Sequence, residues 1–339
     1  MNEAFRWVLG IESSCDETAV ALLKDGKRLA ADLVASQTDL HKAYGGVVPE
    51  LASRQHMETM NYLIDRAVEQ AGVDLFTLDG IAVSKGPGLA GALLVGVSTA
   101  KALAYSLGVP YVGINHMEGH IYANWINHED IPFPLLGLIV SGGHTALMIL
   151  EDHGKYRLLG QTRDDAAGEA YDKVARALGL GYPGGPVLDR LAAEGNPAAF
   201  SLPRARLKDD PWGFSFSGLK TAVLNLMNRL AMKGGEINKA DLAASFQETV
   251  AGYLTEKTME AANAFGIGRI LLAGGVAANS GLRQKITLAC DQEGRSLYIP
   301  EPVYCTDNAA MIACAGYYRL TAGFRDDWTL NAEPALGMI

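Results

Sequence analysis

Two histidines four residues apart, His116 and His120 in the string H-M-E-G-H, have the chemistry and spacing of metal ligands. The string follows an apolar run and opens a helical pattern, and positions i and i+4 of a helix share one face. Asp307 adds a carboxylate, and by the internal symmetry of the chain we expect it to face the histidine pair across a cleft. Two imidazoles and one carboxylate suit Fe(II) or Zn(II). Chance spacing of the histidines and helix capping by Asp307 are the plainer alternatives.

A zinc-protease function is excluded by the position of the glutamate in this string. In the protease motif H-E-x-x-H, the general-base glutamate directly follows the first histidine. Here Met117 holds that position, and Glu118 is rotated about 200° around the helix from His116. Proteolysis therefore lacks its base.

Three loops rich in glycine or hydroxyl groups have the composition of phosphate-binding loops. Glu12–Thr18 and Ser141–Thr145 each join two β-prone runs, and Ala273–Asn279 joins a strand-like run to a helical pattern. Free backbone N–H groups and hydroxyls in such loops bind phosphate oxygens. One such loop alone is more simply an ordinary hairpin, but two at equivalent positions favour phosphate binding. The third loop lacks the lysine of a P-loop, so no Walker mechanism is implied.

Acidic residues beside glycine-rich turns are candidate ribose ligands. Asp172 lies in D-D-A-A-G-E-A-Y-D-K, and Asp189 follows the string G-Y-P-G-G-P that begins at Gly181. In dinucleotide-binding folds an acidic residue of this kind binds ribose hydroxyls. A solvated surface helix is the alternative.

The elements that position these residues occur twice along the chain. The β-prone runs Trp7–Ile11, Thr18–Leu23 and Arg28–Ser36 return as 135–140, 145–150 and 156–161. In each half a strand, a glycine-rich loop, a helix and another strand follow. Such a duplication predicts an α/β fold of two mixed-sheet subdomains, covered by helices and placed around a cleft.

The boundary between the halves is expected where two prolines interrupt the pattern, at Ile131-Pro132-Phe133-Pro134. Residues 1–132 then form the N-terminal subdomain and residues 133–339 the C-terminal one. The second half is longer, with an insertion at about 162–242.

Composition limits the class of protein. The chain has 339 residues and a net charge of −9, which argues against a general nucleic-acid or membrane-surface binder. The stretch 201–240 nevertheless carries a net charge of +4. Its aromatic residues Trp212, Phe214 and Phe216 either stack on nucleic-acid bases or belong to the core.

A soluble cytoplasmic protein is expected. The four cysteines form no Cys-x-x-Cys pair, which favours a reducing compartment. Met1–Arg6 contains no apolar run typical of a signal peptide. The most apolar long stretch, Gly88–Val109, contains Ser98, Lys101 and Ser106, so it is interpreted as a buried helix.

The strings taken together resemble one family, the TsaD family of tRNA N6-adenosine threonylcarbamoyltransferases. The resemblance covers about residues 7 to 324 and rests on G-I-E-S-S-C-D-E-T, Y-G-G-V-V-P-E-L-A-S-R-Q-H, H-M-E-G-H, V-S-G-G-H-T, D-D-A-A-G-E-A-Y-D-K, G-Y-P-G-G-P, F-S-F-S-G-L-K-T, A-G-G-V-A-A-N and C-T-D-N-A-A-M-I-A. It implies an actin-like ATPase fold (sugar kinase/heat-shock/actin). The implied activity is transfer of a threonylcarbamoyl group from threonylcarbamoyl-AMP to adenosine 37 of tRNAs that read codons beginning with A.

The resemblance also implies site residues, cofactors and partners. The metal ligands would be His116, His120 and Asp307, with Fe(II) as the expected ion and Zn(II) as the alternative. Mg²⁺ would accompany ATP, and partners would be TsaB and TsaE proteins, a TsaC-type synthase that supplies the adenylate, and tRNA. Asp16 and Glu17 are candidate general bases, with Glu169 a third. The residues implied to bind the adenylate or another adenine nucleotide are Ile139, Val140, Ser141, Gly142, Gly143, Asp172, Gly185, Asp189 and Asn279.

Two rival functions remain open at this point. One is a small-molecule kinase or ATPase of the same fold, which the phosphate-type loops favour. The other is a non-catalytic scaffold that binds partners through a helical face near Gly45–His56.

Overall fold

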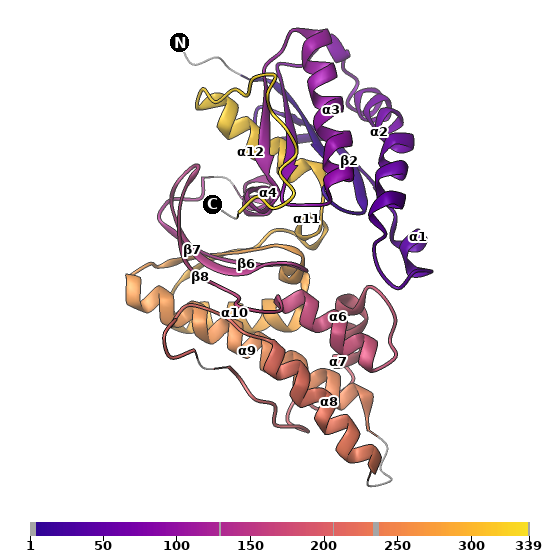
Figure 1. Ribbon diagram of the computed structural model, residues 1–339. Coiled ribbons are helices and arrows are strands. Elements are labelled where there is room, and N and C mark those ends of the chain that lie inside the picture. The colour runs from indigo at the N-terminus through magenta and orange to yellow at the C-terminus, as the bar shows by residue number, and fades with distance from the viewer. Residues whose placement is uncertain (1–4, 129, 206, 233–236, 338–339) are drawn as a thin grey trace. The chain divides into compact units, whose positions relative to one another are not determined.

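The computed structural model describes residues 5–128, 130–205, 207–232 and 237–337 (Figure 1). The chain divides into two compact units. Unit 1 contains Met1–Ile131 and Thr306–Ile339, and unit 2 contains Pro132–Cys305.

Unit 1 is built on a five-stranded mixed sheet of order β3-β2-β1-β4-β5. The central strand β1 is antiparallel to β2 and parallel to β4, so that Ile11 pairs with Val20 on one side and Val83 on the other. The elements of unit 1 are β1 Trp7–Glu12, β2 Glu17–Lys24, β3 Arg28–Ser36, α1 Thr38–Lys42, α2 Pro49–Ala71, a 3-10 helix Leu75–Thr77, β4 Gly80–Gly86, α3 Ala90–Leu107, β5 Tyr111–Asn115, α4 His116–Tyr122, α5 Asn124–Asn127 and α12 Ala309–Thr321.

Helices cover both faces of the unit 1 sheet. Leu9 and Ile11 of β1 lie in one apolar cluster with residues of α2 and α3. Because successive strand residues point to opposite faces, Gly10 lies on the other face, where it meets Ala309 and Ala313 of α12. β1, α4 and α12 are therefore held close together within unit 1, and these are the elements that carry or flank the candidate metal ligands.

Unit 2 contains a second five-stranded mixed sheet, of order β10-β9-β6-β7-β8. Its central strand β6 is antiparallel to β7 and parallel to β9, so that Leu138 pairs with Leu147 and with Leu272. The elements of unit 2 are β6 Leu135–Val140, β7 Thr145–Asp152, β8 Lys155–Gln161, α6 Ala167–Ala177, α7 Gly184–Ala192, α8 Ser217–Met232, α9 Lys239–Phe265, β9 Arg269–Ala273, a 3-10 helix Gly275–Ala278, α10 Ser280–Glu293, β10 Ser296–Tyr298 and α11 Pro302–Cys305.

The two sheets have the same topology, which confirms the predicted duplication and the α/β fold class. Reading β6 for β1, β7 for β2, β8 for β3, β9 for β4 and β10 for β5 converts one strand order into the other. The expected extent of the second half needs a correction, because residues 306–337 pack in unit 1. The reason is α12, whose buried face is rich in alanine and lies against the first sheet.

The aromatic residues of the stretch 201–240 belong partly to the core. Phe214 and Phe216 are fully buried, and both contact Tyr253 of α9 in edge-to-face geometry. These two rings are therefore not exposed for stacking on nucleic-acid bases. Arg206, Lys233 and Glu236, which contribute to the charge of the stretch, lie outside the described residues.

Within the described part of the chain, α3 is the one helix that is long and apolar enough to cross a membrane. Its residues Leu93, Gly96, Val97 and Ala100 are buried in unit 1. A helix that packs into the core of a soluble protein passes the same test of length and composition.

Candidate metal and nucleotide sites

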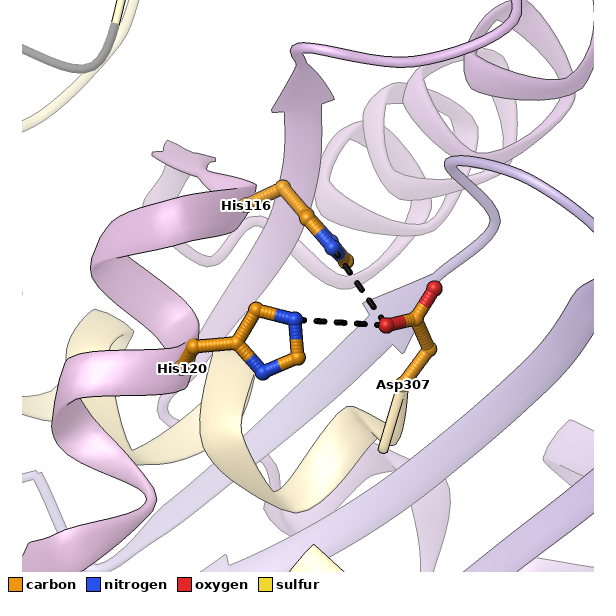
Figure 2. Close-up of side chains that lie close together, drawn as sticks. All are labelled: His116, His120 and Asp307. Carbon is orange, nitrogen blue, oxygen red and sulfur yellow. Dashed lines mark ion pairs between the residues drawn. The ribbon is translucent and has the colours of Figure 1, made fainter. Parts of the chain in front are cut away.

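His116, His120 and Asp307 converge in unit 1, as the sequence analysis expects of metal ligands (Figure 2). Nε2 of His116 lies 3.4 Å from Oδ1 of Asp307, and Nε2 of His120 lies 3.3 Å from the same oxygen. One ligand atom from each residue falls within a group that spans 4.8 Å. The cluster joins the first turns of α4 to the loop before α12.

Local sequence explains how these side chains are positioned. The side chain of Asn115 caps α4 by accepting a hydrogen bond from the N–H of Met117, so the helix starts at His116. Gly119, between the two histidines, lets α12 approach, because a Cβ there would come within 2.7 Å of Ile312. Position 119 of the H-M-E-G-H string therefore requires glycine.

Asp307 does not cap α12, which corrects the plainer alternative for this residue. The capping side chain is Asn308, whose Oδ1 accepts a hydrogen bond from the N–H of Met311. Asp307 also lies in the same unit as the histidines, so its approach to them does not depend on the symmetry between the two halves.

The donor set and its spacing fit a transition metal ion. Two donor atoms that each lie about 2.1 Å from a tetrahedrally coordinated ion are about 3.4 Å apart. The two nitrogen–oxygen separations, 3.4 and 3.3 Å, are close to this value. Three protein ligands of this type leave further coordination positions for a substrate, as in catalytic rather than structural sites.

Electrostatics keep Asp307 ionised. Burial opposes ionisation, but the two imidazoles outweigh it and hold the pKa of Asp307 well below its usual range. Burial likewise opposes protonation of His116, and the carboxylates of Asp307 and Glu12 outweigh it and raise its pKa. The cluster therefore attracts positive charge strongly, as a cation site requires.

Sequence reasoning missed three residues that contact the helix or loop bearing the ligands. The carboxylate of Glu12 and the hydroxyl of Ser14 both lie within hydrogen-bond distance of Nδ1 of His116. Arg319 of α12 makes an ion pair with Glu118, which confirms that Glu118 points away from the metal ligands. Glu12 and Ser14 belong to the G-I-E-S-S string, but nothing in that string shows which side chain they contact.

Of the candidate bases, Asp16 lies in the loop between β1 and β2, and Glu17 is the first residue of β2, in the same unit. Burial, and then the carboxylates of Asp307 and Asp16, raise the pKa of Glu17 to about 9. Burial also raises the pKa of the Cys15 thiol, so this cysteine is not a thiolate nucleophile. Glu17 is thus a proton donor at neutral pH unless positive charge is brought near it.

The buried His56 of α2 forms hydrogen bonds with Cys15 in this loop and with Thr18 in β2. Its Nε2 lies 2.9 Å from the carbonyl oxygen of Cys15, and its Nδ1 lies 2.7 Å from the hydroxyl of Thr18. A carbonyl only accepts, so Nε2 carries a proton; because burial lowers the pKa of the ring, Nδ1 carries none at neutral pH and accepts from Thr18. His56 is therefore neutral, with both ring nitrogens engaged.

We expect His56 to contribute less to the free energy of unfolding as the pH is lowered. Burial lowers its pKa, although Glu12 and Asp16 favour the protonated ring. Below about pH 6.5 the ring binds a proton in the unfolded state but not in the folded state. The free energy of unfolding contributed by His56 is therefore complete above that pH and decreases below it. In urea titrations between pH 7.5 and 5.5, the stability difference between wild type and His56→Gln should narrow by up to about 1.4 kcal/mol per pH unit. A pH-independent difference would contradict the assigned ring state.

In unit 2, the predicted phosphate loop lies beside the glycine-rich loop after β9. Gly274 has φ +91, and a Cβ there would come within 2.4 Å of the carbonyl oxygen of Val140. The Ser141 hydroxyl accepts a hydrogen bond from the N–H of His144, while Gly142 and Gly143 are exposed. Ile139 and Val140 are fully buried strand residues, so their side chains are not offered to a ligand.

The remaining predicted nucleotide residues form two hydrogen-bonded groups in unit 2. Asp172 of α6 accepts from the N–H of Gly184, next to Gly185. Asp189 of α7 accepts from the Asn279 side-chain amide at 3.1 Å and from the Ser280 hydroxyl at 2.7 Å. Gln247 of α9, which sequence reasoning missed, accepts from the same amide of Asn279 at 2.8 Å.

Asn279→Ala is expected to weaken nucleotide binding and to destabilise unit 2 by about 1–2 kcal/mol. Asn279 caps α10 through the N–H of Leu282, and loss of such a cap costs about that amount. Asn238 is a matched control, because it caps α9 of the same unit and has no predicted ligand role. Thermal unfolding should show that both variants are destabilised, Asn279→Ala more strongly because it also loses the amide bonds to Asp189 and Gln247. Calorimetric titration should show weaker ATP binding only in Asn279→Ala. Equal ATP affinity in the two variants would contradict this assignment.

A duplicated mixed sheet of this order is the architecture of actin-like ATPase-fold proteins, and here it carries a candidate metal centre. The sequence model of one family, TsaD: tRNA N6-adenosine threonylcarbamoyltransferase, matches residues 28–314. A protein of that name from Clostridium perfringens is 52% identical over 329 residues, which are 97% of each chain. One from Geobacillus thermodenitrificans is 54% identical over 340 residues, covering 100% of this chain and 98% of the relative. The chain belongs to the TsaD family of enzymes.

Solved structures agree with the fold assignment. Full-length HypF in its phosphate- and nucleotide-bound form matches with a TM-score of 0.61 at 15% identity, over 93% of this chain. The match covers 46% of the HypF chain, so it shows the fold of one part of that protein. Because the full-length relatives carry a transferase name, the kinase and scaffold alternatives are not favoured.

Proposed function

We propose that this protein transfers the threonylcarbamoyl group of threonylcarbamoyl-AMP to the exocyclic amine of adenosine 37 in tRNAs that read ANN codons. The observation that carries the proposal is the convergence of His116, His120 and Asp307 in a chain of the TsaD family. The three residues would hold one divalent metal ion, with Fe(II) as the proposed ion and Zn(II) as the alternative. When bound, the ion would supply Lewis-acid polarisation of the carbamoyl carbonyl.

The residues of unit 2 would hold the nucleotide of the adenylate. Backbone N–H groups of Ser141–Gly143 would bind its phosphate, and Asp172 and Asp189 would bind ribose hydroxyls. Asp189 already accepts three hydrogen bonds, from the Asn279 amide and from the N–H and the hydroxyl of Ser280, and an ionised carboxylate has about four acceptor positions. One position of Asp189 therefore stays available, and its orientation is fixed before the ligand arrives.

The chemistry is an acyl transfer. The adenine amine attacks the carbamoyl carbon, the bond from that carbon to the phosphate oxygen breaks, and AMP leaves with the electron pair. The amine proton passes to a base, for which Asp16 and Glu17 are the candidates in unit 1. The raised pKa of Glu17, about 9, makes its ionised form a better proton acceptor than an ordinary carboxylate. Glu169, the third candidate, is paired with Lys173 at 2.6 Å in unit 2.

The proposal includes partners and a compartment. The adenylate is unstable to water, so a TsaC-type synthase would deliver it, and TsaB and TsaE proteins would complete the working complex. Mg²⁺ would accompany any ATP bound at the nucleotide residues of unit 2. All of this chemistry belongs in the cytoplasm, where tRNA is modified.

Reconstitution tests the proposal. The purified chain is mixed with TsaB, TsaE, a TsaC-type synthase, tRNA, threonine, bicarbonate and ATP, and nucleosides are analysed by mass spectrometry. Formation of threonylcarbamoyladenosine that requires this chain supports the proposal. Its absence from a mixture in which a relative's protein is active would overturn it.

A further inference from the structure

Glu12 is a fully buried carboxylate whose one ion-pair partner among the described residues is His116. It ends β1 and is 0% exposed. Its Oε2 lies 3.0 Å from Nδ1 of His116, and its Oε1 accepts a hydrogen bond from the N–H of Ser14 at 2.5 Å. A buried carboxylate is costly unless it is paired and hydrogen-bonded. The imidazole of His116 is therefore the group that makes the burial of Glu12 tolerable.

The two ring nitrogens of His116 have different partners. Nδ1 faces Glu12, while Nε2 faces Asp307 at 3.4 Å, where the candidate metal ligands converge. A carboxylate that has lost its proton only accepts hydrogen bonds, so when a metal ion takes the place of the proton on Nε2, the remaining ring proton is held on Nδ1 and donated to Glu12. In that form the lone pair of Nε2 is directed at the candidate metal position, as a metal ligand requires.

His120 has no comparable support. Its Nε2 lies 3.3 Å from Asp307, but its Nδ1 is buried without a hydrogen-bond partner in the described part of the chain. The Ser14 hydroxyl also reaches Nδ1 of His116, at 3.2 Å, as an uncharged and longer contact. Orientation by a carboxylate is thus specific to His116, and Glu12 supplies it.

We propose that Glu12 is a positioning residue for the metal site. It fixes the tautomer and the ring orientation of His116, and it thereby increases the affinity of the site for a divalent metal ion. Carboxylates that orient metal-bound histidines typically contribute about 10–100-fold to metal affinity. The inference rests on the proposed metal ligation by His116, His120 and Asp307, and Glu12 acts through His116 without touching substrate.

Zn(II) affinity of the full-length chain, measured by competition with a chromogenic chelator, tests this role. Glu12→Ala is expected to weaken Zn(II) binding by about 100-fold. Glu12→Gln keeps a weaker acceptor in the same place and should lose about tenfold. Ser14→Ala, which leaves the carboxylate intact, is the matched control and should lose clearly less than either.

A spectroscopic signature separates positioning from a merely structural role. In the Zn(II)-loaded chain with ¹⁵N-labelled histidine, the Nδ1 proton of His116 should be protected from solvent exchange, and Glu12→Ala should abolish that protection. A structural role would lower thermal stability and leave both the tautomer and the Zn(II) affinity of the folded variant unchanged. If Glu12→Ala does not fold, the nearly isosteric Glu12→Gln decides, and wild-type affinity in that variant overturns the proposal.

The same titration distinguishes this inference from the proposed function. A wild-type chain that fails to bind Zn(II) and Fe(II) would overturn the metal site itself. A wild-type chain that binds Zn(II) while both Glu12 variants bind it equally well would overturn only the role of Glu12.

Discussion

Replacing His116 and His120 together with alanine is expected to abolish metal binding and to lower tRNA modification by on the order of 10³-fold. The double variant leaves Asp307 as the single remaining ligand of the three. Lewis-acid polarisation contributes several kcal/mol to transition-state stabilisation, and about 4 kcal/mol corresponds to that factor. Metal content is measured by elemental mass spectrometry, and modification by the reconstituted assay with tRNA.

A control separates loss of the ligands from loss of histidine in general. His128→Ala/His153→Ala also removes two imidazoles, but from positions outside the cluster. This control should keep its metal and its activity. Modification of tRNA at the wild-type rate by His116→Ala/His120→Ala would rule out the metal-centred mechanism.

Local sequence patterns were sufficient to predict the fold. The runs around Leu9, Val20 and Leu138 are apolar, β-prone and repeated in order, and the two sheets they form have one topology. Hydrophobic periodicity and repetition are local properties, so they can be detected without knowing which residues meet in space. The histidine pair was detectable for the same reason, since its spacing lies within a single helix.

The rest of the site depends on contacts between residues far apart in the sequence. The placement of Asp307 in unit 1 follows from how α12 packs, because Gly10 of β1 meets Ala309 and Ala313. A pattern of small residues in α12 indicates burial but not the sheet that it covers. The symmetry argument therefore expected Asp307 beside the histidines, where the structure has it, but expected it to come from the second half, whereas it packs in unit 1.

The same reason explains why Glu12 and Arg319 were missed. Acidic and basic residues are usually exposed, and the sequence gives no sign that Glu12 is fully buried or that Glu118 is nearly so. Burial turns these carboxylates into costly groups that need one specific partner. Those partners, His116 and Arg319, lie 104 and 201 residues away in the chain.

Arg319→Ala is expected to destabilise unit 1 by about 3 kcal/mol, lowering the melting temperature by roughly 10 °C. Two guanidinium nitrogens of Arg319 contact one carboxylate oxygen of Glu118, at 2.7 and 2.9 Å. The Glu118 side chain is 2% exposed, so removing Arg319 takes the counter-charge from a carboxylate that water hardly reaches. Breaking a buried ion pair from one side costs about 3–5 kcal/mol. The lower end applies here because Arg319 itself is 32% exposed.

Removing both charges should cost much less than removing one. In Glu118→Met/Arg319→Met neither a buried carboxylate nor a guanidinium remains, and apolar replacement of a buried pair is often neutral or stabilising. Urea unfolding of the single and double variants therefore separates the cost of an uncompensated charge from the cost of lost packing, including the contact of Arg319 with the Phe324 ring.

The pair joins α4, which carries His116 and His120, to α12, which begins two residues after Asp307. The double variant should thus be stable but hold metal less firmly, whereas equal destabilisation by both variants would show that packing and not charge holds the two helices together.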